Sequence, residues 1–332
     1  MKLVVVGFGF MGMTHTINIL KNPNLRLAAI VDKNENVVRE KVGENPGNFT
    51  TGSLSVEELA KIKVYTNLVE CLDTEKPDAC VIAVHTALHY EMTKLTLEKG
   101  VHVFLEKPFC LNIEEGEKLI SLAKSQNKLL MIGHVVRFMP AYEKLKEMVD
   151  SQEFGKLEFL SLHRFSGLPA WGQWAEKQKD FGSSGGALFD LVIHDIDFAQ
   201  WLCGVPNKID ASCLPGKLSN HDYVSAMWSY NHSDLKVKVE GGNTFHSAYP
   251  FQAGFSARFA NASILFSSKE SDNIVVATDT ETKLIPVGDA NDGFSGELYY
   301  FTDCIRKNEV PEKCTAESAL EAIKVCWLMV NG

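Results

Sequence analysis

The sequence predicts an α/β fold in two parts: a doubly wound parallel sheet, then a second α/β domain whose sheet is mostly antiparallel. The chain has 332 residues, which is room for two domains. Strand-like and helix-like segments alternate up to residue 132, as they do in parallel sheets covered by helices. Beyond residue 155, strand-like segments recur at short intervals without helices between them, which favours antiparallel pairing.

The chain opens on a strand, a glycine-rich turn and a helix. Residues 2–6 are a continuous apolar run, typical of a strand buried in a parallel sheet. Gly7, Gly9 and Gly12 follow in the pattern G-x-G-x-x-G, and residues 11–20 have a helical pattern. The first glycine permits the tight turn, the second lets a pyrophosphate approach the backbone, and the third lets the helix pack against the sheet. The helix N-terminus attracts the same pyrophosphate. The unit is therefore typical of a Rossmann dinucleotide-binding domain.

An acidic residue ends the second strand of this unit. Residues 25–31 form that strand, and Asp32 lies 20 positions beyond Gly12, where an acid can bind the adenosine ribose hydroxyls. A carboxylate there repels a 2′-phosphate, which favours NAD over NADP. Lys33 comes next and can offset part of that repulsion, so NADP stays as the alternative cofactor. Asp32 could also be only a solvated residue at a strand end.

The alternation continues through the first domain. We expect strands at 64–65, 78–84, 101–105 and 129–132, and helical segments at 67–72, 88–99 and 113–125. Ligands of parallel sheets bind at the carboxyl ends of the strands. We therefore expect the glycine turn, Asp32, His85–Thr86 and Glu106–Lys107–Pro108 to line one crevice.

Lys107 stands at the tip of the strand at 101–105. Pro108 follows directly, and a proline at a strand tip ends the hydrogen-bond ladder and fixes the chain. A cation held at the cofactor crevice can orient a substrate hydroxyl group or stabilise a developing oxyanion. The alternative is an ordinary surface lysine in a β-to-α loop.

One stretch of the second half, residues 185–197, combines two glycines with a helical pattern that carries ionisable groups. Asp190 and His194 are four positions apart and share a helix face, and Asp197 lies three positions further on. A carboxylate one turn from an imidazole can fix its tautomer and support its cationic form, as acid–base catalysis requires. A metal site and a histidine that is only structural are the two alternatives. We expect no metal, because the sequence offers no third ligand at a telling spacing.

The break at residues 125–127 places the domain boundary between 1–124 and 125–332. Strand-like stretches of the second domain lie at 156–165, 208–213, 224–230, 236–241, 251–260, 262–266 and 273–277, and a closing helix at 317–330. Trp171 and Trp174 lie in a glycine-containing loop before the helix of His194. Tryptophans in such a place can form an apolar wall against a sugar ring, or they can anchor the loop in the core.

Composition limits the partners. The net charge of −9 is unlike the basic surface that nucleic acids require, and no apolar run approaches the ~20 residues that cross a bilayer. The eight cysteines include no C-x-x-C pair, which argues against a zinc ribbon and a redox pair. They are spread singly, and several lie in apolar runs as a free thiol does, so a reduced, cytoplasmic protein is expected.

These motifs together resemble the glucose–fructose oxidoreductase/inositol dehydrogenase (Gfo/Idh/MocA) family over essentially the whole chain. They are the opening Gly-Phe-Gly-Phe-Met-Gly with His15, Glu106-Lys107-Pro108, the stretch 133–142, the stretch 185–197, and Gly296-Glu297-Leu298-Tyr299-Tyr300-Phe301. The resemblance implies a large open sheet in the second domain whose free face makes a homodimer or homotetramer. It also implies a cis Lys107–Pro108 bond. Two positions depart from the family pattern: His85–Thr86 stand where Thr-Pro-Asn is common, and Cys110 where small or apolar residues are usual.

The resemblance implies specific roles as well. Lys107, Asp190 and His194 match the catalytic residues, with the histidine as proton acceptor and the lysine on the reacting oxygen. The candidates for substrate contact are His134, Arg137, Trp171 and Trp174. The residues predicted to bind NAD, or NADP, are Gly7, Phe8, Gly9, Phe10, Met11, Gly12, Asp32, Lys33, His85, His89, Glu106 and Lys107.

The sequence thus predicts a dehydrogenase that transfers hydride between nicotinamide and a secondary alcohol of a sugar, inositol or sugar derivative. Two other functions stay open. One is elimination of a glycoside driven by transient oxidation with a retained cofactor. The other is a catalytically silent sensor of sugar or cofactor.

Overall fold

The computed structural model describes residues 1–40, 52–168, 185–270 and 272–331. These residues form two compact units. Unit 1 contains Met1–His134 and Phe294–Leu320, and unit 2 contains Val135–Gly293 and Glu321–Gly332. None of the helices in the described part of the chain is long and apolar enough to cross a membrane.

Unit 1 is built on a parallel sheet, sheet A, of six strands in the order β3-β2-β1-β4-β5-β6. This is the strand order of a doubly wound dinucleotide-binding domain, so the predicted Rossmann fold is confirmed. The strands are β1 (Lys2–Val6), β2 (Arg26–Val31), β3 (Val64–Tyr65), β4 (Ala79–Ile82), β5 (His102–Glu106) and β6 (Leu130–Gly133). Strands β1 and β4 are buried almost throughout, because helices cover both faces of the sheet.

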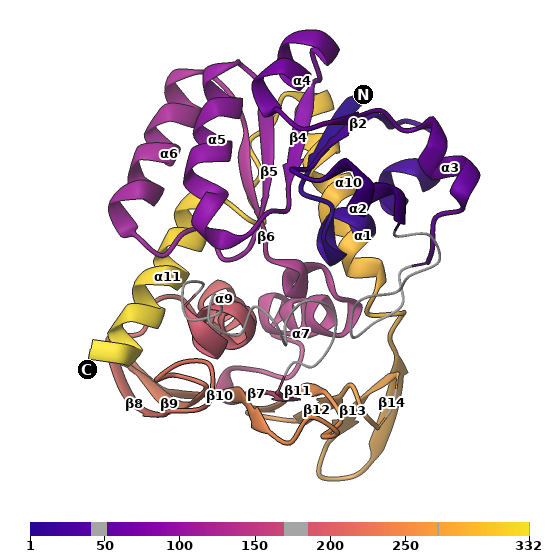
Figure 1. Ribbon diagram of the computed structural model, residues 1–332. Helices are drawn as coiled ribbons and strands as arrows, with labels where there is room; N and C mark the ends of the chain where they lie inside the picture. Colours follow the sequence, from indigo (N-terminus) through magenta and orange to yellow (C-terminus); the bar gives the residue numbers. More distant parts are fainter. Residues whose placement is uncertain (41–51, 169–184, 271, 332) are drawn as a thin grey trace. The chain divides into compact units, whose positions relative to one another are not determined.

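The helices of unit 1 are α1 (Phe10–Lys21), α2 (Glu35–Glu40), α3 (Val56–Lys61), α4 (Leu68–Glu75), η1 (Thr86–Leu88), α5 (His89–Glu98), α6 (Ile113–Ser125), α10 (Asp292–Lys307) and the start of α11 (Ala316–Asn331). Helices α5 and α6 lie side by side on one face of sheet A (Figure 1), and α1 and α10 lie on the other. The Phe104 ring of β5 faces this second side, with its centroid 5.1 Å from that of His15 and 5.8 Å from that of Phe301.

Unit 2 is built on sheet B, eight strands in the order β14-β13-β12-β11-β7-β10-β9-β8. All pairs are antiparallel except β10 with β7, so the predicted mostly antiparallel sheet is confirmed. The strands are β7 (Leu157–Gly167), β8 (Lys208–Leu214), β9 (Tyr223–Tyr230), β10 (Ser233–Phe245), β11 (Gln252–Phe259), β12 (Ser263–Ser267), β13 (Asn273–Ala277) and β14 (Thr282–Pro286).

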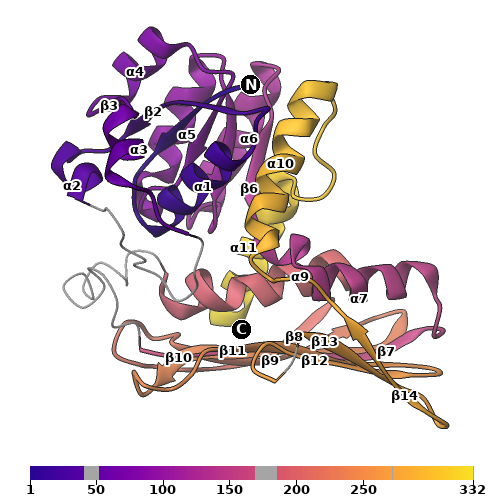
Figure 2. The ribbon, with the colours of Figure 1, turned by 90° about the vertical axis from the view of Figure 1, so that its right-hand side faces the viewer.

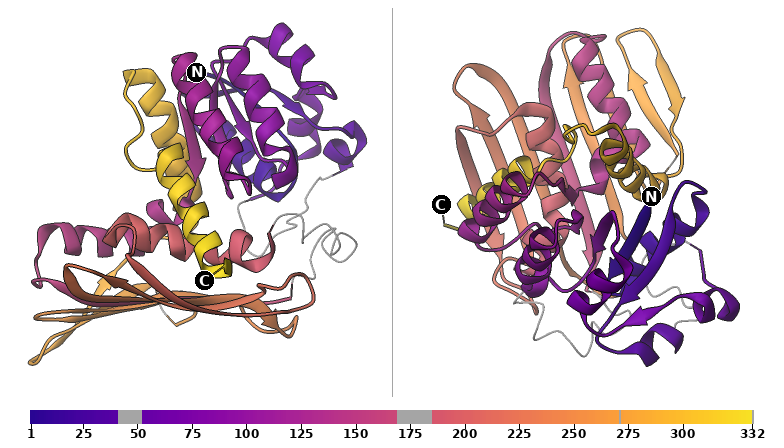
Figure 3. Two further views of the ribbon diagram at one scale, coloured as in Figure 1. Left: turned by 90° about the vertical axis from the view of Figure 1, so that its left-hand side faces the viewer. Right: turned by 90° about the horizontal axis from the view of Figure 1, so that it is seen from above.

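One face of sheet B is covered by α7 (Pro140–Ser151) and α9 (Ile193–Cys203), as Figures 2 and 3 show. The side chains of β7 and β9 alternate between buried and partly exposed positions along each strand, as a sheet with one covered face requires. Two short elements, η2 (Val135–Phe138) and η5 (Leu188–Val192), precede these helices in the chain.

The predicted domain boundary at residue 124 differs from the observed division at His134. Residues 125–134 stay in unit 1 because β6 pairs with β5 along Val103–Glu106 and completes sheet A. The chain also returns to unit 1 late, through α10 and the first turns of α11. Neither feature has a local signal in the sequence, since both depend on contacts between distant segments.

Candidate active site

The glycine turn between β1 and α1 has the geometry that a bound pyrophosphate requires. Gly7 has φ +88°, and a Cβ on it would come within 2.5 Å of the Ala83 carbonyl oxygen. A Cβ on Gly12 would lie 1.9 Å from the Gly7 oxygen. A Cβ on Gly9, in contrast, would meet nothing within 4 Å. The residues present therefore fit the predicted cofactor: two glycines are needed for the fold, and the third leaves open space at the start of α1.

Asp32 lies at the tip of β2, beside this turn. Its Oδ2 accepts a hydrogen bond of 2.8 Å from the backbone N–H of Phe8, and its Oδ1 accepts one of 3.1 Å from that of Asn34. The carboxylate thus holds the glycine turn and remains partly exposed, while Lys33 next to it is exposed. Phe8 is 1% exposed, so only its backbone can face a cofactor.

Two histidines follow β4. His85 is exposed, and its Nδ1 accepts a hydrogen bond of 3.3 Å from the Ala87 N–H, which caps η1. His89 is buried, with Nδ1 2.8 Å from the Pro108 oxygen and Nε2 3.1 Å from the Val84 oxygen. The prediction that His89 binds the cofactor is corrected, because both of its ring nitrogens face backbone carbonyls. His89 instead ties the loop after β4 to the loop after β5.

The two residues at the end of β5 differ in their exposure. Glu106 points inward: it is 6% exposed, and its Oε1 lies 2.6 Å from His15 Nε2. The side chain of Glu106 is therefore directed into unit 1, which leaves its backbone for the predicted crevice. Lys107, the next residue, is partly exposed at the carboxyl edge of sheet A, and the predicted cis Lys107–Pro108 bond is confirmed.

The segment that carries Asp190 and His194 begins at two glycines with positive φ, Gly185 at +90° and Gly186 at +71°. Asp190 lies in η5, a π-helical turn, and His194 lies in the first turn of α9. A π-turn widens the helix by about one residue and commonly marks a functional site. Both side chains are partly exposed, whereas most of their neighbours on η5 and α9 are buried.

Two buried ion pairs hold α9 in unit 2. Asp197 receives hydrogen bonds of 2.8 Å from Arg137 Nε and 2.6 Å from its second guanidinium nitrogen, and both side chains are 1% exposed. Asp195 accepts hydrogen bonds of 2.7 and 3.1 Å from Arg164 of β7. Each arginine thus holds its aspartate through two hydrogen bonds. Asp195 directly follows His194 in the sequence, and Asp197 lies three positions after it. They fix the helix against η2 on one side and against sheet B on the other.

Two of the four candidates for substrate contact lie within the described residues. Arg137 is buried with Asp197, which favours a structural role over the predicted contact with substrate. His134 is 1% exposed at the end of β6, and its backbone N–H bonds to the Ile132 oxygen at 2.8 Å. This burial favours a structural role for His134, and its contact with substrate stays a prediction. Trp171 and Trp174 lie outside the described residues.

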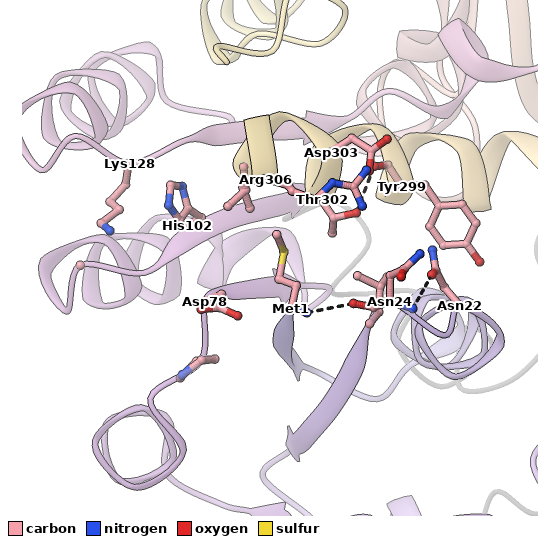
Figure 4. A pocket seen from close by; sticks show the side chains of 14 residues that line it. Met1, Asn22, Asn24, Asp78, His102, Lys128, Tyr299, Thr302, Asp303 and Arg306 are labelled. Atoms are coloured by element: carbon pink, nitrogen blue, oxygen red, sulfur yellow. Dashed lines mark hydrogen bonds and ion pairs between the residues drawn. The ribbon is translucent and has the colours of Figure 1, made fainter. Parts of the chain in front are cut away.

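Unit 1 also has a cavity of about 790 Å³ at the opposite edge of sheet A (Figure 4). Met1, Asp78, His102 and Lys128 line it from the amino ends of β1, β4, β5 and β6. Cofactors of parallel sheets bind at the carboxyl ends. This cavity is therefore distinct from the site of the glycine turn, Asp32 and Lys107.

The glycine turn, with a carboxylate at the tip of β2, defines a dinucleotide-binding protein. Residues 1–134 match the family model for the oxidoreductase family with an NAD-binding Rossmann fold, GFO_IDH_MocA. Residues 142–259 match the model for the GFO/IDH/MocA C-terminal domain. The chain therefore belongs to the Gfo/Idh/MocA oxidoreductase family, as the motifs predict.

Relatives match along almost the whole chain. A scyllo-inositol 2-dehydrogenase (NAD+) of Bacillus subtilis is 24% identical over 93% of this chain and 87% of its own length. A myo-inositol 2-dehydrogenase of Thermotoga maritima is 23% identical over 94% and 86%. Among solved structures, a probable dehydrogenase from Thermotoga maritima superposes with a TM-score of 0.80 at 20% identity, over all of this chain and 96% of that one. At that identity, the likeness supports the fold alone.

The sequence patterns assign no role to three buried ionisable residues, two in unit 1 and one in unit 2. His15 and Glu297 appear only as parts of family motifs, and Arg164 not at all. Threonines flank His15 on both sides, and His163 precedes Arg164, so no apolar pattern marks these residues as buried. Their partners are too distant in the sequence to be assigned by spacing.

Proposed function

We propose that the chain oxidises a secondary hydroxyl group of an inositol, a sugar or a sugar derivative with NAD as hydride acceptor. The observation that carries the proposal is that each unit supplies one half of the required chemistry. Unit 1 offers the glycine turn with Asp32 and Lys107 at one sheet edge, and unit 2 offers Asp190 and His194 on a segment fixed by two buried ion pairs. The inositol dehydrogenases that match most of this chain support the substrate class.

Each residue has a defined part in this proposal. His194 accepts the proton of the reacting hydroxyl group. Asp190 orients the imidazole and stabilises its cationic form. Lys107 stabilises the oxygen as it becomes a carbonyl. When bound, the nicotinamide accepts the hydride. The experiment that tests the proposal is a panel of inositols, aldoses and nucleotide sugars assayed for NADH formation with NAD and with NADP.

Replacing Asp32 with asparagine should weaken the preference for NAD over NADP by about tenfold or more. The asparagine side chain keeps an oxygen that can accept the Phe8 N–H, so the glycine turn is preserved, but the charge that repels a 2′-phosphate is lost. Fluorescence titration with NADH and NADPH measures both dissociation constants. Lys33→Ala is the matched control and should weaken NADP more than NAD. An unchanged ratio in Asp32→Asn would exclude Asp32 from cofactor selection.

We also propose a homodimer or homotetramer formed through the face of sheet B that α7 and α9 leave uncovered. Leu265, Val275 and Leu284 are paired across β12, β13 and β14, and the two leucines are 41% and 63% exposed. An apolar row across three strands is typical of a self-complementary interface.

Replacing both Leu265 and Leu284 with lysine should raise the dimer dissociation constant by about tenfold or more, because each lysine faces apolar or like-charged groups across the interface. Light scattering coupled to size-exclusion chromatography measures the molar mass against concentration. Val310→Lys, at a position 74% exposed in unit 1, is the control and should leave the mass unchanged. A wild-type protein that is monomeric at all concentrations would contradict the proposal.

A further inference from the structure

Three ionisable side chains meet in the interior of unit 1. His15 comes from α1, Glu106 from the tip of β5, and Glu297 from α10. Their exposed fractions are 0%, 6% and 0%, and one nitrogen or oxygen atom of each lies within 4.8 Å of the others. In the part of the chain that the structure describes, no other three histidine, cysteine or acidic side chains meet so closely.

The contacts within this cluster are uneven. His15 Nε2 and Glu106 Oε1 are 2.6 Å apart, a charge-assisted hydrogen bond. Neither carboxyl oxygen of Glu297 has a hydrogen-bond partner among the described residues. An aromatic ring lies against the cluster: Phe104 packs edge-on against His15, and a Cβ on Gly133 of β6 would lie 3.0 Å from the Phe104 ring and 3.5 Å from the Glu106 carboxyl carbon. A protonated His15 would offset the charge of Glu106 through this bond.

Two carboxylates this close cannot both stay ionised in a dry interior. Burial, and then the charge of Glu106, raise the pKa of Glu297 well above its usual range. A protonated Glu297 has an O–H to donate, and the Glu106 carboxylate next to it is the available acceptor. A proton shared between Glu297 and Glu106 thus gives each carboxyl group a hydrogen-bond partner, and no other group is needed.

We propose that His15, Glu106 and Glu297 form a proton-sharing network, with Glu297 as the neutral acid, and that this network positions Lys107. The network binds Glu106 from α1 and from α10, so the end of β5 is fixed on both sides. Lys107 is the next residue, and its place follows from that of Glu106. The effect on Lys107 rests on the proposed function, whereas the protonation of Glu297 does not.

A divalent cation is the alternative occupant, since one imidazole and two carboxylates can ligate a metal ion. The 2.6 Å bond between His15 and Glu106 favours the proton, because a metal ion at His15 Nε2 would have to break it. The experiment below separates the two occupants.

Unit 1 contains a matched control in Glu75. It is also 6% exposed, but Lys63 Nζ lies 2.7 Å and the Tyr65 hydroxyl 2.9 Å from its Oε1, and Lys2 Nζ lies 3.1 Å from Oε2. The hydrogen bond from Lys63 is the main cause that lowers the pKa of Glu75 to about 2. Glu75 is therefore a buried carboxylate, and Glu297 a buried acid, in the same folded unit.

Infrared difference spectra of the apoprotein at about pH 7 test the protonation directly. The wild-type spectrum minus that of Glu297→Gln should show the C=O stretch of a protonated carboxyl group. The wild-type spectrum minus that of Glu75→Gln should show only carboxylate bands. If Glu297→Gln does not fold, the side-chain 13C shift of Glu297 in labelled wild-type protein gives the same answer. A carboxylate signal from Glu297 would overturn the proposal, and so would stoichiometric Zn²⁺ binding that Glu297→Gln abolishes.

The two glutamates should also affect the pH dependence of stability in opposite directions. The folded protein holds the Glu297 proton more tightly than the unfolded chain does, so the denaturation midpoint falls as the pH rises above about 4.3. Glu75 has a lowered pKa, so its contribution is lost as the pH falls from about 4.3 towards 2. Glu297→Gln should remove the first slope and Glu75→Gln the second. Equal slopes in Glu297→Gln and wild type would contradict a neutral Glu297.

Glu106→Gln tests the link to Lys107. We expect kcat to fall by about tenfold or more with little change in the Kd of NAD, and the pH profile of kcat/KM to shift because the shared proton is lost. Glu75→Gln should leave the pH profile unchanged. A fall in stability without any shift in the pH profile would reduce the network to a structural role. If the wild type shows no turnover, the proposed function is wrong, but the infrared test of Glu297 protonation remains valid.

Discussion

Replacing His194 with alanine, or Lys107 with methionine, is expected to lower kcat by at least ~100-fold while NAD still binds. The first variant removes the proton acceptor for the reacting hydroxyl group, and the second removes the cation that stabilises the oxygen as charge develops. Both side chains are partly exposed, so neither loss should unfold its unit. Steady-state kinetics on the best substrate of the panel measure kcat, and NADH fluorescence measures cofactor binding.

The form of the kinetic change is as informative as its size. An interaction made only in the transition state lowers kcat and kcat/KM equally, whereas uniform binding would change KM alone. His232→Ala, in the exposed turn between β9 and β10, and Lys128→Met, at the opposite edge of sheet A, are the matched controls. If His194→Ala or Lys107→Met turned over like these controls, the assignment of that residue as catalytic would be wrong.

The same measurements separate the other functions that the sequence leaves open. Elimination driven by transient oxidation would consume the substrate without net NADH, and it would require a cofactor that stays with the purified protein. A sensor would bind sugar and cofactor without turnover in the wild type. A dehydrogenase produces one NADH for each substrate molecule oxidised, and this stoichiometry is measured directly.

Local patterns predicted most of the elements. The helix at Ile113–Ser125 has the predicted bounds, because Asn112 caps its first turn through Glu114 N–H and its apolar positions recur with helical spacing. The strand at Asn273–Ala277 also has its predicted bounds. The prediction did not include α7 and β14. In α7, the buried Ala141, Tyr142, Leu145 and Met148 recur with helical spacing, so the apolar signal was present and the prediction missed it. Strand β14 has an almost wholly exposed pattern and therefore gives no apolar signal.

The site was predicted less completely than the fold, for a physical reason. Gly7, Gly9, Gly12 and Asp32 are recognisable because a turn and a strand tip impose local rules on the residue type. Glu106 and His89 lie at the predicted edge of the sheet, but their side chains point into the protein. The direction of a side chain at a strand tip depends on its partners. His15, the partner of Glu106, is 91 residues away in the sequence, so spacing along the chain cannot reveal it.

Arg137→Met should destabilise the protein by about 3–5 kcal/mol, because it leaves the Asp197 carboxylate buried without its counter-ion. The guanidinium makes two hydrogen bonds to Asp197, and its carbon lies 5.5 Å from the centre of the Trp201 ring. Methionine fills a similar volume but supplies no charge. Denaturant unfolding measures the loss of free energy, which corresponds to a fall in Tm on the order of 10 °C.

The double variant Arg137→Met with Asp197→Leu identifies the cause of that loss. Replacing both members of a buried ion pair with apolar residues is often neutral or stabilising, so the double variant should regain most of the stability that the single variant loses. A role in substrate contact predicts the opposite result: a raised KM in Arg137→Met at unchanged stability, with no rescue by the second substitution. A double variant that is stable yet has a lowered kcat would show that this ion pair, besides holding α9, sets the position of His194, three residues before Asp197.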